Sequence, residues 1–239
     1  MRPEYTRKCV ESLRANYPDV KIIVGNSDKP DESLETFVLE NGGRYIELPF
    51  DCGITVARNL MMNEVKTKYV LVGDDDFFYD KNAHLEILLK LMNVADVAGG
   101  RVYEHGILRS YQGDVENDNG VLRSTPLDMN NYDNYDGADY KKCDIVFNFF
   151  IANRYIISQI PWDEKIKVAY EHSDWFISLK GKAVVVFSPD AIVIHKPKLD
   201  NPINEDYENY RSRRGDKDYF FKKHKIHATF DFAGRIDGV

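Results

Sequence analysis

The sequence has little of what disulfide-rich and membrane-spanning proteins need. Only three cysteines occur in 239 residues, and Cys9, Cys52 and Cys143 are widely spaced. A sparse, odd set argues against a disulfide framework or a zinc cluster and favours a reducing compartment. No apolar run reaches the roughly 18 residues that a transmembrane helix needs, so no membrane span is expected in this chain.

Two further absences concern location and partners. The opening residues 1–4 lack the apolar region of a signal peptide, so we expect a cytoplasmic protein. Positive charge is not in excess, because the formal net charge is -7, which argues against a nucleic-acid partner. The chain does have a hydrophobic fraction of 43%, and its 239 residues fit one large domain or one domain with a tail.

Helical and strand patterns alternate along the first part of the chain. Tyr5, Cys9, Leu13 and Tyr17 recur at four-residue spacing and predict a helix over residues 4–17. The alternation predicts an α/β fold with a mostly parallel sheet flanked by helices. Further helices are predicted at 31–40, 54–65, 83–92 and 171–180, and strands at 20–24, 44–48, 68–72, 96–102, 183–187 and 191–195.

The rhythm changes after residue 102. Residues 112–142 are rich in Asp, Asn, Tyr and Gly, which is typical of loops or short irregular strands, so the second half is expected to be smaller and irregular or antiparallel. We expect one domain over residues 1–199. Residues 200–239 carry several basic side chains and are expected to form a basic tail or a helix that packs on that domain.

Three consecutive carboxylates, Asp74, Asp75 and Asp76, follow the apolar run 69–73. Like charges this close disfavour joint ionisation unless a cation lies among them, and hard oxygen ligands suit Mg²⁺ or Mn²⁺. Ligands of open α/β sheets bind outside the carboxyl ends of the strands, which is where these residues are expected. A solvated Asp-rich turn explains the triplet alone equally well.

Three other motifs carry candidate chemistry. Residues 53–59 open a helix, where an N-terminus attracts anions and Arg58 adds donors for phosphate, although a surface arginine is the simpler reading. Glu171 and Asp174 begin a helix beside a histidine and two aromatic residues, and either acid is a candidate general base or an ordinary partner of the helix dipole. His195 ends an apolar strand and is a candidate metal ligand or a structural edge residue, with Lys196 placed to flank a diphosphate.

Four segments carry a family resemblance when they are taken together. They are YPDVKIIVGNSD, GITVARNLMMNEVKTKYVLVGDDDFFYD, VFNFFIANR and YEHSDWFISLKGKAVVVFSPDAIVIH. In this order they resemble metal-dependent glycosyltransferases of the GT-A fold, within family 2, and most of all the β-1,4-N-acetylgalactosaminyltransferases. The resemblance runs from about Arg2 to His195. Relatives usually begin with a strand before the first helix, whereas this sequence starts at the helix, which leaves that strand's contacts to the base in doubt.

The resemblance implies a role for each matching residue. Residues 1–102 would form the nucleotide-binding half and residues 103–199 the acceptor half of a catalytic domain. The metal, Mn²⁺ or Mg²⁺, would be held by Asp76 and His195 together with Asp74. The general base would be Asp174 or Glu171, with Asp174 preferred. The nucleotide sugar would contact Asn26, Ser27, Asp28, Arg58, Asp74, Asp75 and Lys196.

The implied reaction is inverting transfer of a sugar from a UDP-sugar donor to a hydroxyl of a glycan or glycolipid acceptor. Sugar-phosphate nucleotidyl transfer is an alternative, but the glycine-rich phosphate loop that it needs is absent from the N-terminal part of the sequence. A non-catalytic sugar- or metal-binding module is a second alternative. It would keep the aspartates but would have no need of the acidic cluster at Glu171 and Asp174.

Overall fold

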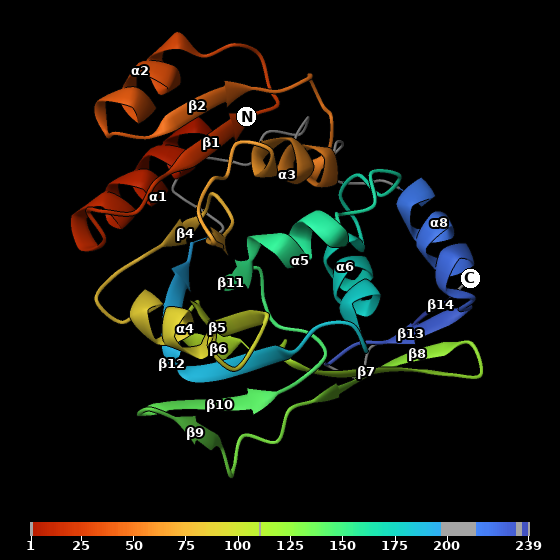
Figure 1. Cartoon of the computed structure of the whole chain (residues 1–239). Coiled ribbons are helices and arrows are strands. Elements are labelled where there is room, and N and C mark those ends of the chain that lie inside the picture. The colour runs from red at the N-terminus through yellow and green to blue at the C-terminus, as the bar shows by residue number, and fades with distance from the viewer. Residues whose placement is uncertain (1, 110, 197–213, 233–235, 239) are drawn as a thin grey trace.

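The computed structural model describes residues 2–109, 111–196, 214–232 and 236–238 (Figure 1). The helices are α1 (Pro3–Asn16), α2 (Glu32–Glu40), α3 (Ile54–Met62), α4 (Leu85–Leu91), α5 (Arg154–Gln159), α6 (Glu171–Leu179) and α8 (Arg214–His224). The strands are β1 (Ile23–Asn26), β2 (Arg44–Glu47), β3 (Tyr69–Val72), β4 (Phe77–Phe78), β5 (Val97–Glu104), β6 (Ile107–Arg109), β7 (Gly113–Asp118), β8 (Val121–Pro126), β9 (Asp133–Tyr135), β10 (Ala138–Lys142), β11 (Phe150–Asn153), β12 (Val185–His195), β13 (Ala228–Phe230) and β14 (Ile236–Gly238).

The predicted helices and strands of the first hundred or so residues are confirmed, with ends that differ by a few residues. Local chemistry explains several ends. Asp31 caps α2 by accepting a hydrogen bond from the Leu34 backbone N–H, and Pro occupies the first turn of α1, where its missing N–H costs nothing. The two strands predicted at 183–187 and 191–195 form the single strand β12, whose register shifts between Phe187 and Ile192.

The α/β fold is confirmed, but the expectation of a mostly parallel sheet is wrong in detail. The eight-stranded sheet has the order β3-β11-β5-β12-β10-β9, with β4 and β6 attached to β12 and β5. Strand β11 lies antiparallel between β3 and β5, β12 runs parallel to β5, and β10 is antiparallel to β12. The sheet is mixed because β11 enters from the irregular second half, and an apolar run such as 150–153 does not encode which direction the strand takes.

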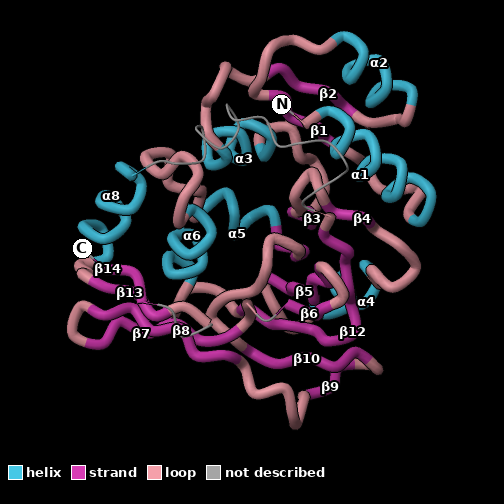
Figure 2. The backbone as a smooth tube through the Cα atoms, turned by 180° about the vertical axis from the view of Figure 1, so that it is seen from behind, coloured by secondary structure: helices cyan, strands magenta, loops and turns pink. Residues whose placement is uncertain are grey.

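Strands β1 and β2 pair in parallel and form a separate two-stranded sheet. In both backbone views α1, α2, β1 and β2 lie together at one end of the molecule (Figures 1 and 2). Residues of β1 and of β3, the edge strand of the larger sheet, border one shared cleft. The cleft therefore lies between the two sheets, next to the carboxyl ends of β1 and β3.

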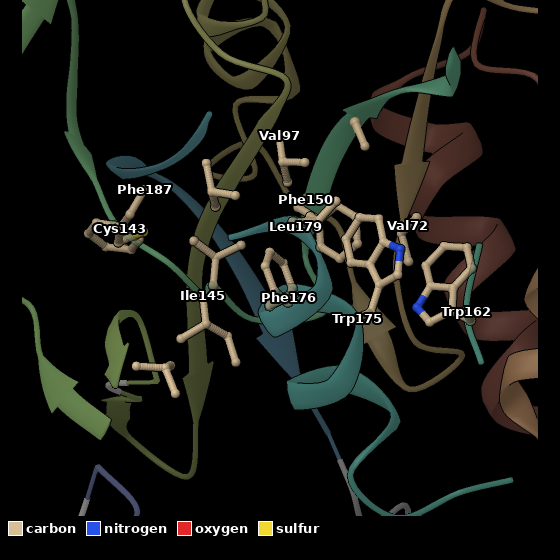
Figure 3. Packing of buried hydrophobic residues seen from close by; sticks show 14 of the residues in the cluster. Val72, Val97, Cys143, Ile145, Phe150, Trp162, Trp175, Phe176, Leu179 and Phe187 are labelled. Carbon is tan, nitrogen blue, oxygen red and sulfur yellow. The ribbon is translucent and has the colours of Figure 1, made fainter. Parts of the chain in front are cut away.

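An aromatic stack anchors α6 to the large sheet (Figure 3). The ring of Trp175 stacks between Phe150 of β11, at 5.4 Å between centroids, and Trp162, at 4.9 Å. Phe176 and Leu179 of the same helix are fully buried in this cluster. Burying an aromatic side chain stabilises the fold by roughly 1.5–3 kcal/mol, so this contact fixes the position at which the N-terminus of α6 enters the cleft.

The C-terminal part of the chain is integrated into the fold where the structure describes it. Strand β13 pairs in parallel with β8, and α8 buries Phe220 and Phe221 in the same core cluster as Trp175. Figure 2 shows α8 beside α6, at the end of the molecule away from α1 and α2. Part of the predicted basic tail, residues 200–213, lies outside the described residues. No helix among the described residues is long and apolar enough to cross a membrane.

Candidate active site

The cleft between the two sheets has a volume of about 2270 Å³. Many of its polar lining residues lie at the carboxyl ends of strands or in the first turns of helices, as in ligand sites of α/β sheets. The predicted site residues that border it are Asn26, Ser27, Asp28, Arg58, Asp74, Asp75, Asp76, Glu171 and His195, whereas Asp174 and Lys196 do not.

Asp76 and His195 meet although 119 positions separate them in the sequence. Strand β4, which follows Asp76, pairs antiparallel with the end of β12, and His195 lies opposite Phe77. The Asp76 Oδ2 and His195 Nε2 atoms are 3.2 Å apart. Burial lowers the pKa of His195, but the carboxylates of Asp76 and Glu104 outweigh this effect and raise it. Burial raises the pKa of Asp76, and hydrogen bonding to His195 with the charge of Arg2 lowers it by more.

These two side chains fit a divalent cation. Ligands on adjacent corners of an octahedral ion at about 2.1 Å lie about 3 Å apart, close to the 3.2 Å between Asp76 Oδ2 and His195 Nε2. The other carboxylate oxygen of Asp76, Oδ1, is buried and has no hydrogen-bond partner. The guanidinium of Arg2 forms ion pairs with both Asp75 and Asp76, so these carboxylates lie beside a positive charge.

The protein supplies an incomplete ligand set for such an ion. In the part of the chain that the structure describes, no three His, Cys, Asp or Glu side chains converge as a metal site. Mg²⁺ and Mn²⁺ are commonly held by one or two protein side chains together with substrate phosphates and water. The arrangement at Asp76 and His195 is therefore suited to a metal that binds together with a diphosphate.

Asp74 points to a different group of side chains from Asp76. Its Oδ1 accepts a hydrogen bond from Arg58 Nη2 at 3.3 Å, and its Oδ2 is 3.5 Å from Asn148 Nδ2. Burial raises the pKa of the Asp74 carboxyl group, and the charge of Arg58 opposes this effect. Both oxygens of Asp74 are engaged by these contacts, so Asp74 is left out of the metal set.

Arg58 is buried rather than a surface arginine, so the simpler reading of its motif is wrong. Only 7% of its surface is exposed, and its guanidinium carbon lies 5.4 Å from the ring centre of Trp162. Nη1 has no hydrogen-bond partner and lies 3.7 Å from Glu171 Oε1, beyond hydrogen-bond distance. A buried cation with an unsatisfied donor in a cleft is suited to an anionic ligand.

The N-terminus of α3 is held so that Arg58 reaches the cleft. Gly53 has φ 87°, a left-handed conformation that strongly favours glycine, and an added Cβ would lie 3.0 Å from Lys167. The backbone N–H of Ile54 donates to the Lys167 carbonyl, and the Thr55 hydroxyl donates to the Ile166 carbonyl. The segment before α6 thus fixes the start of α3.

Glu171 faces the cleft from the first turn of α6. The side chain is mostly buried, and its Oε1 lies 3.7 Å from Arg58 Nη1. Burial raises the pKa of the Glu171 carboxyl group, with the nearby Arg58 acting in the opposite direction. A carboxylate with a raised pKa that shares a cleft with cations has the properties of a general base.

His172 occupies the position next to Glu171 and has a structural role. Its ring lies within hydrogen-bond distance of Asn148 and of the Val146 carbonyl, and burial lowers its pKa to about 3. These contacts position Asn148, whose amide in turn contacts Asp74. Asn148 was missed by the sequence reasoning. Its place in the apolar run 145–151 was the available signal, because an amide there needs a polar partner.

Asp174 turns away from the cleft toward α8, which argues against the preference for it as the base. It is 2% exposed. Its carboxylate accepts hydrogen bonds from Lys223 Nζ at 2.9 Å and lies 2.7 Å from His224 Nε2. Lys223 also contacts Asp163 at 2.8 Å. Both oxygens of Asp174 are used in joining α6 to α8, so its position is that of a structural residue.

Replacing Asp174 with asparagine is expected to reduce stability and to leave the chemistry of folded protein nearly unchanged. Losing a hydrogen bond to a charged group costs about 1.5–3 kcal/mol, which lowers Tm by roughly 3–12 °C for a domain of this size. Thermal unfolding monitored by circular dichroism measures the change. Asp218→Asn, on the exposed side of α8, is the matched control. An unchanged Tm would contradict the structural role.

Of the remaining predicted residues, Asn26, Ser27 and Asp28 border the cleft and Lys196 does not. Asn26 is the last residue of β1, and its side chain donates to the Lys29 carbonyl and to the Tyr45 hydroxyl and accepts from the Asp28 backbone N–H. This network fixes the turn that borders the cleft. Lys196 donates its backbone N–H to the Asp76 carbonyl, while its ammonium lies 4.3 Å from the ring centre of Phe78. The structure therefore ties Lys196 to the strand ends and keeps its charge outside the cleft.

Comparison with known proteins identifies the family. The family model described as glycosyl transferase family 2 matches residues 1–160. The chain belongs to glycosyl transferase family 2. The match covers the N-terminal elements from α1 to α5, together with Arg58 and the three aspartates.

Two N-acetylgalactosaminyltransferases match a longer stretch of the chain. Mouse beta-1,4 N-acetylgalactosaminyltransferase 2 is 27% identical over 221 residues, covering 89% of this chain and 42% of that protein. Human beta-1,4 N-acetylgalactosaminyltransferase 1 is 29% identical over 229 residues, covering 88% and 41%. This chain thus spans less than half the length of either relative.

Solved structures with the same fold support the assignment. GalNAc-T7, crystallised with UDP, GalNAc and Mn²⁺, superposes with a TM-score of 0.63 at 15% identity, covering 90% of this chain and 47% of that one. TarS 1–349 of S. aureus gives a TM-score of 0.54 at 14% identity, covering 83% and 56%. At these identities the likeness establishes the GT-A glycosyltransferase fold of this family 2 chain.

Proposed function

We propose that this chain is the catalytic domain of an inverting glycosyltransferase that moves a sugar from a UDP-sugar to a hydroxyl of a glycan or glycolipid with the help of Mn²⁺ or Mg²⁺. One observation carries the proposal. A single cleft contains an Asp76–His195 pair with an unpartnered buried oxygen, a buried Arg58 with an unpartnered donor, and an acid, Glu171, whose pKa burial raises. Together they provide for a cation, a diphosphate and a general base.

The residues of the chain divide the work of the reaction. Arg58 would bind an oxygen of the diphosphate through Nη1, and Asn26 with Asp28 would border the base of the nucleotide. Asp76 and His195 would hold the cation, which when bound neutralises the negative charge that develops on the leaving diphosphate. Desolvation in the cleft strengthens these electrostatic contacts.

Glu171 would accept the proton of the acceptor hydroxyl. As the acceptor oxygen forms its bond to the anomeric carbon, the bond from that carbon to the diphosphate oxygen breaks, and UDP leaves with the bonding electrons. The carbon passes through an oxocarbenium-like state, as in other glycosyl chemistry. Attack on the face opposite to the leaving group inverts the anomeric configuration. The identity of the named relatives makes UDP-N-acetylgalactosamine the first donor to test.

Release of free UDP tests the proposal. The purified chain is incubated with Mn²⁺ and a panel of nucleotide sugars, with EDTA as the control for metal dependence, and the anomeric configuration of the product is read by NMR. We expect UDP release that EDTA abolishes and a product of inverted configuration. Pyrophosphate exchange with a sugar phosphate would indicate nucleotidyl transfer instead. No turnover of any donor or acceptor would leave a binding module.

Replacing Arg58 with lysine is expected to weaken UDP binding by about 10- to 100-fold. A hydrogen bond between charged groups contributes about 1.5–3 kcal/mol, and lysine lacks the planar fork of donors that fits a phosphate. Isothermal titration calorimetry with UDP and Mn²⁺ gives the affinity. Arg123→Lys on β8, which contacts Asp118 and Phe230, is the control and should bind UDP as the wild type does. Equal affinity of the two variants would remove Arg58 from the diphosphate site.

A further inference from the structure

Glu104 contacts the ring nitrogen of His195 that does not face Asp76, and it has no role in the proposed mechanism. Glu104 is the last residue of β5, which runs parallel to β12 with Tyr103 opposite Ile194. The two carboxyl ends therefore place Glu104 beside His195, and Glu104 Oε2 lies 2.8 Å from His195 Nδ1. The contact joins residues that are 91 positions apart in the sequence.

The contact determines how the imidazole ring presents its other nitrogen. A carboxylate oxygen can only accept at neutral pH, so Nδ1 carries the proton that it donates to Glu104. Nε2 faces the Asp76 carboxylate. When a cation takes the place of the proton on Nε2, the lone pair of the neutral ring would lie on that atom. The His195 ring is further restrained by Phe77. The two ring centroids lie 5.5 Å apart, at an interplanar angle of 88°.

A side chain on the neighbouring strand restrains Glu104. Its Oε1 lies 3.6 Å from Arg109 Nη1, on the neighbouring strand β6. The turn between β5 and β6 consists of His105 and Gly106, with φ 50° and 83°, a pair of left-handed residues that suits a two-residue hairpin. This tight turn fixes the register that pairs Val102 with Arg109. Glu104 and Arg109 both border the cleft.

We infer that Glu104 is a positioning residue that orients His195 for cation binding and selects the Nδ1–H tautomer of its ring. The inference rests on the proposed function, because it assumes that Asp76 and His195 bind a divalent cation. Histidine ligands of metals commonly donate their second N–H to a carboxylate or carbonyl, and losing that partner typically lowers metal affinity by 10- to 100-fold. Glu104 stands in this relation to His195.

Three variants of Glu104 separate contact from charge. Glu104→Met keeps the length of the side chain and cannot accept the hydrogen bond. Glu104→Asp keeps the charge and is too short to reach Nδ1 in the same geometry. Glu104→Gln keeps an oxygen at that position and loses the charge. Glu116→Gln, on the exposed side of β7, is the matched control.

Binding of Mn²⁺ alone, and of Mn²⁺ in the presence of UDP, is measured by the EPR signal of the free ion. We expect about 10- to 100-fold weaker Mn²⁺ binding for the Met and Asp variants. Glu104→Gln should stay within a few-fold of the wild type, and Glu116→Gln should not change. The ¹⁵N NMR spectrum of the protein with Mg²⁺ and UDP supplies a signature that a merely structural role would not move, namely a His195 proton held on Nδ1 in the wild type and no longer confined to Nδ1 in Glu104→Met.

The outcomes separate this inference from the proposed function. If the wild type binds no Mn²⁺, the cation site and with it the proposed mechanism are wrong. If the wild type binds Mn²⁺ and both the Met and Asp variants bind it within twofold, the cation site stands and the role of Glu104 is refuted. If one variant fails to fold, as its Tm would show, the other decides.

Discussion

Asp76→Asn is expected to abolish Mn²⁺-dependent sugar transfer. The variant keeps the size of the side chain but removes the anionic oxygen that lies 3.2 Å from His195 Nε2 and leaves Oδ1 without charge. Stabilisation of the leaving group by a metal is worth several kcal/mol, which corresponds to a loss of roughly 10³-fold or more in kcat/KM. Release of UDP from the donor, measured at saturating Mn²⁺, gives the effect.

Two companion variants sharpen this test. Asp80→Asn, in the turn after β4, changes a neighbouring carboxylate that accepts hydrogen bonds from the backbone and side-chain N–H groups of Asn82, and it should keep wild-type activity. His195→Gln should lose activity to a similar degree, and the double variant should lose little more, since groups that act as one unit are non-additive. If Asp76→Asn retains activity that EDTA abolishes, another group holds the metal.

Glu171→Gln is expected to lower kcat by about 10²- to 10⁴-fold, the usual contribution of a general base. The amide keeps the shape of the side chain but accepts no proton, while Asp76, His195 and Arg58 are left intact. UDP and Mn²⁺ binding should therefore survive. Steady-state kinetics for kcat and calorimetry for UDP binding distinguish the two effects.

The pH profile adds a second readout for Glu171. Burial raises the pKa of this carboxyl group, and the base acts only when it is deprotonated. Activity of the wild type should therefore fall as the pH decreases through the raised pKa, at a higher pH than an exposed glutamate would give. Asp174→Asn is the matched control one turn along α6. A large loss of kcat in Asp174→Asn, with Glu171→Gln active, would reverse the assignment of the base.

Local sequence patterns determined much of this fold. The period of apolar residues predicted α1 to α4 and the strands β1, β2 and β3, because amphipathic periodicity depends on neighbours within a few residues. It did not predict the two-residue strand β4. The run of aspartates after an apolar strand also predicted where ligands would bind, because residues at the carboxyl end of a strand lie at the sheet edge. Asp76 and His195 were candidates because they follow or end strands, and Arg58 because it lies in the first turns of a helix. All three border the cleft.

Only the tertiary structure decided the direction of β11 and the partners of the acids. Glu171 and Asp174 lie one turn apart on the same helix, and no local signal separates them. The difference arises from α8, where Lys223 lies 49 positions further along the chain and engages Asp174. The contact between Glu104 and His195 also depends on the tertiary structure, because only the pairing of β5 with β12 brings the two residues together. Short-range periodicity encodes which face of an element is buried, whereas the partner of a charged side chain depends on contacts between segments distant in sequence.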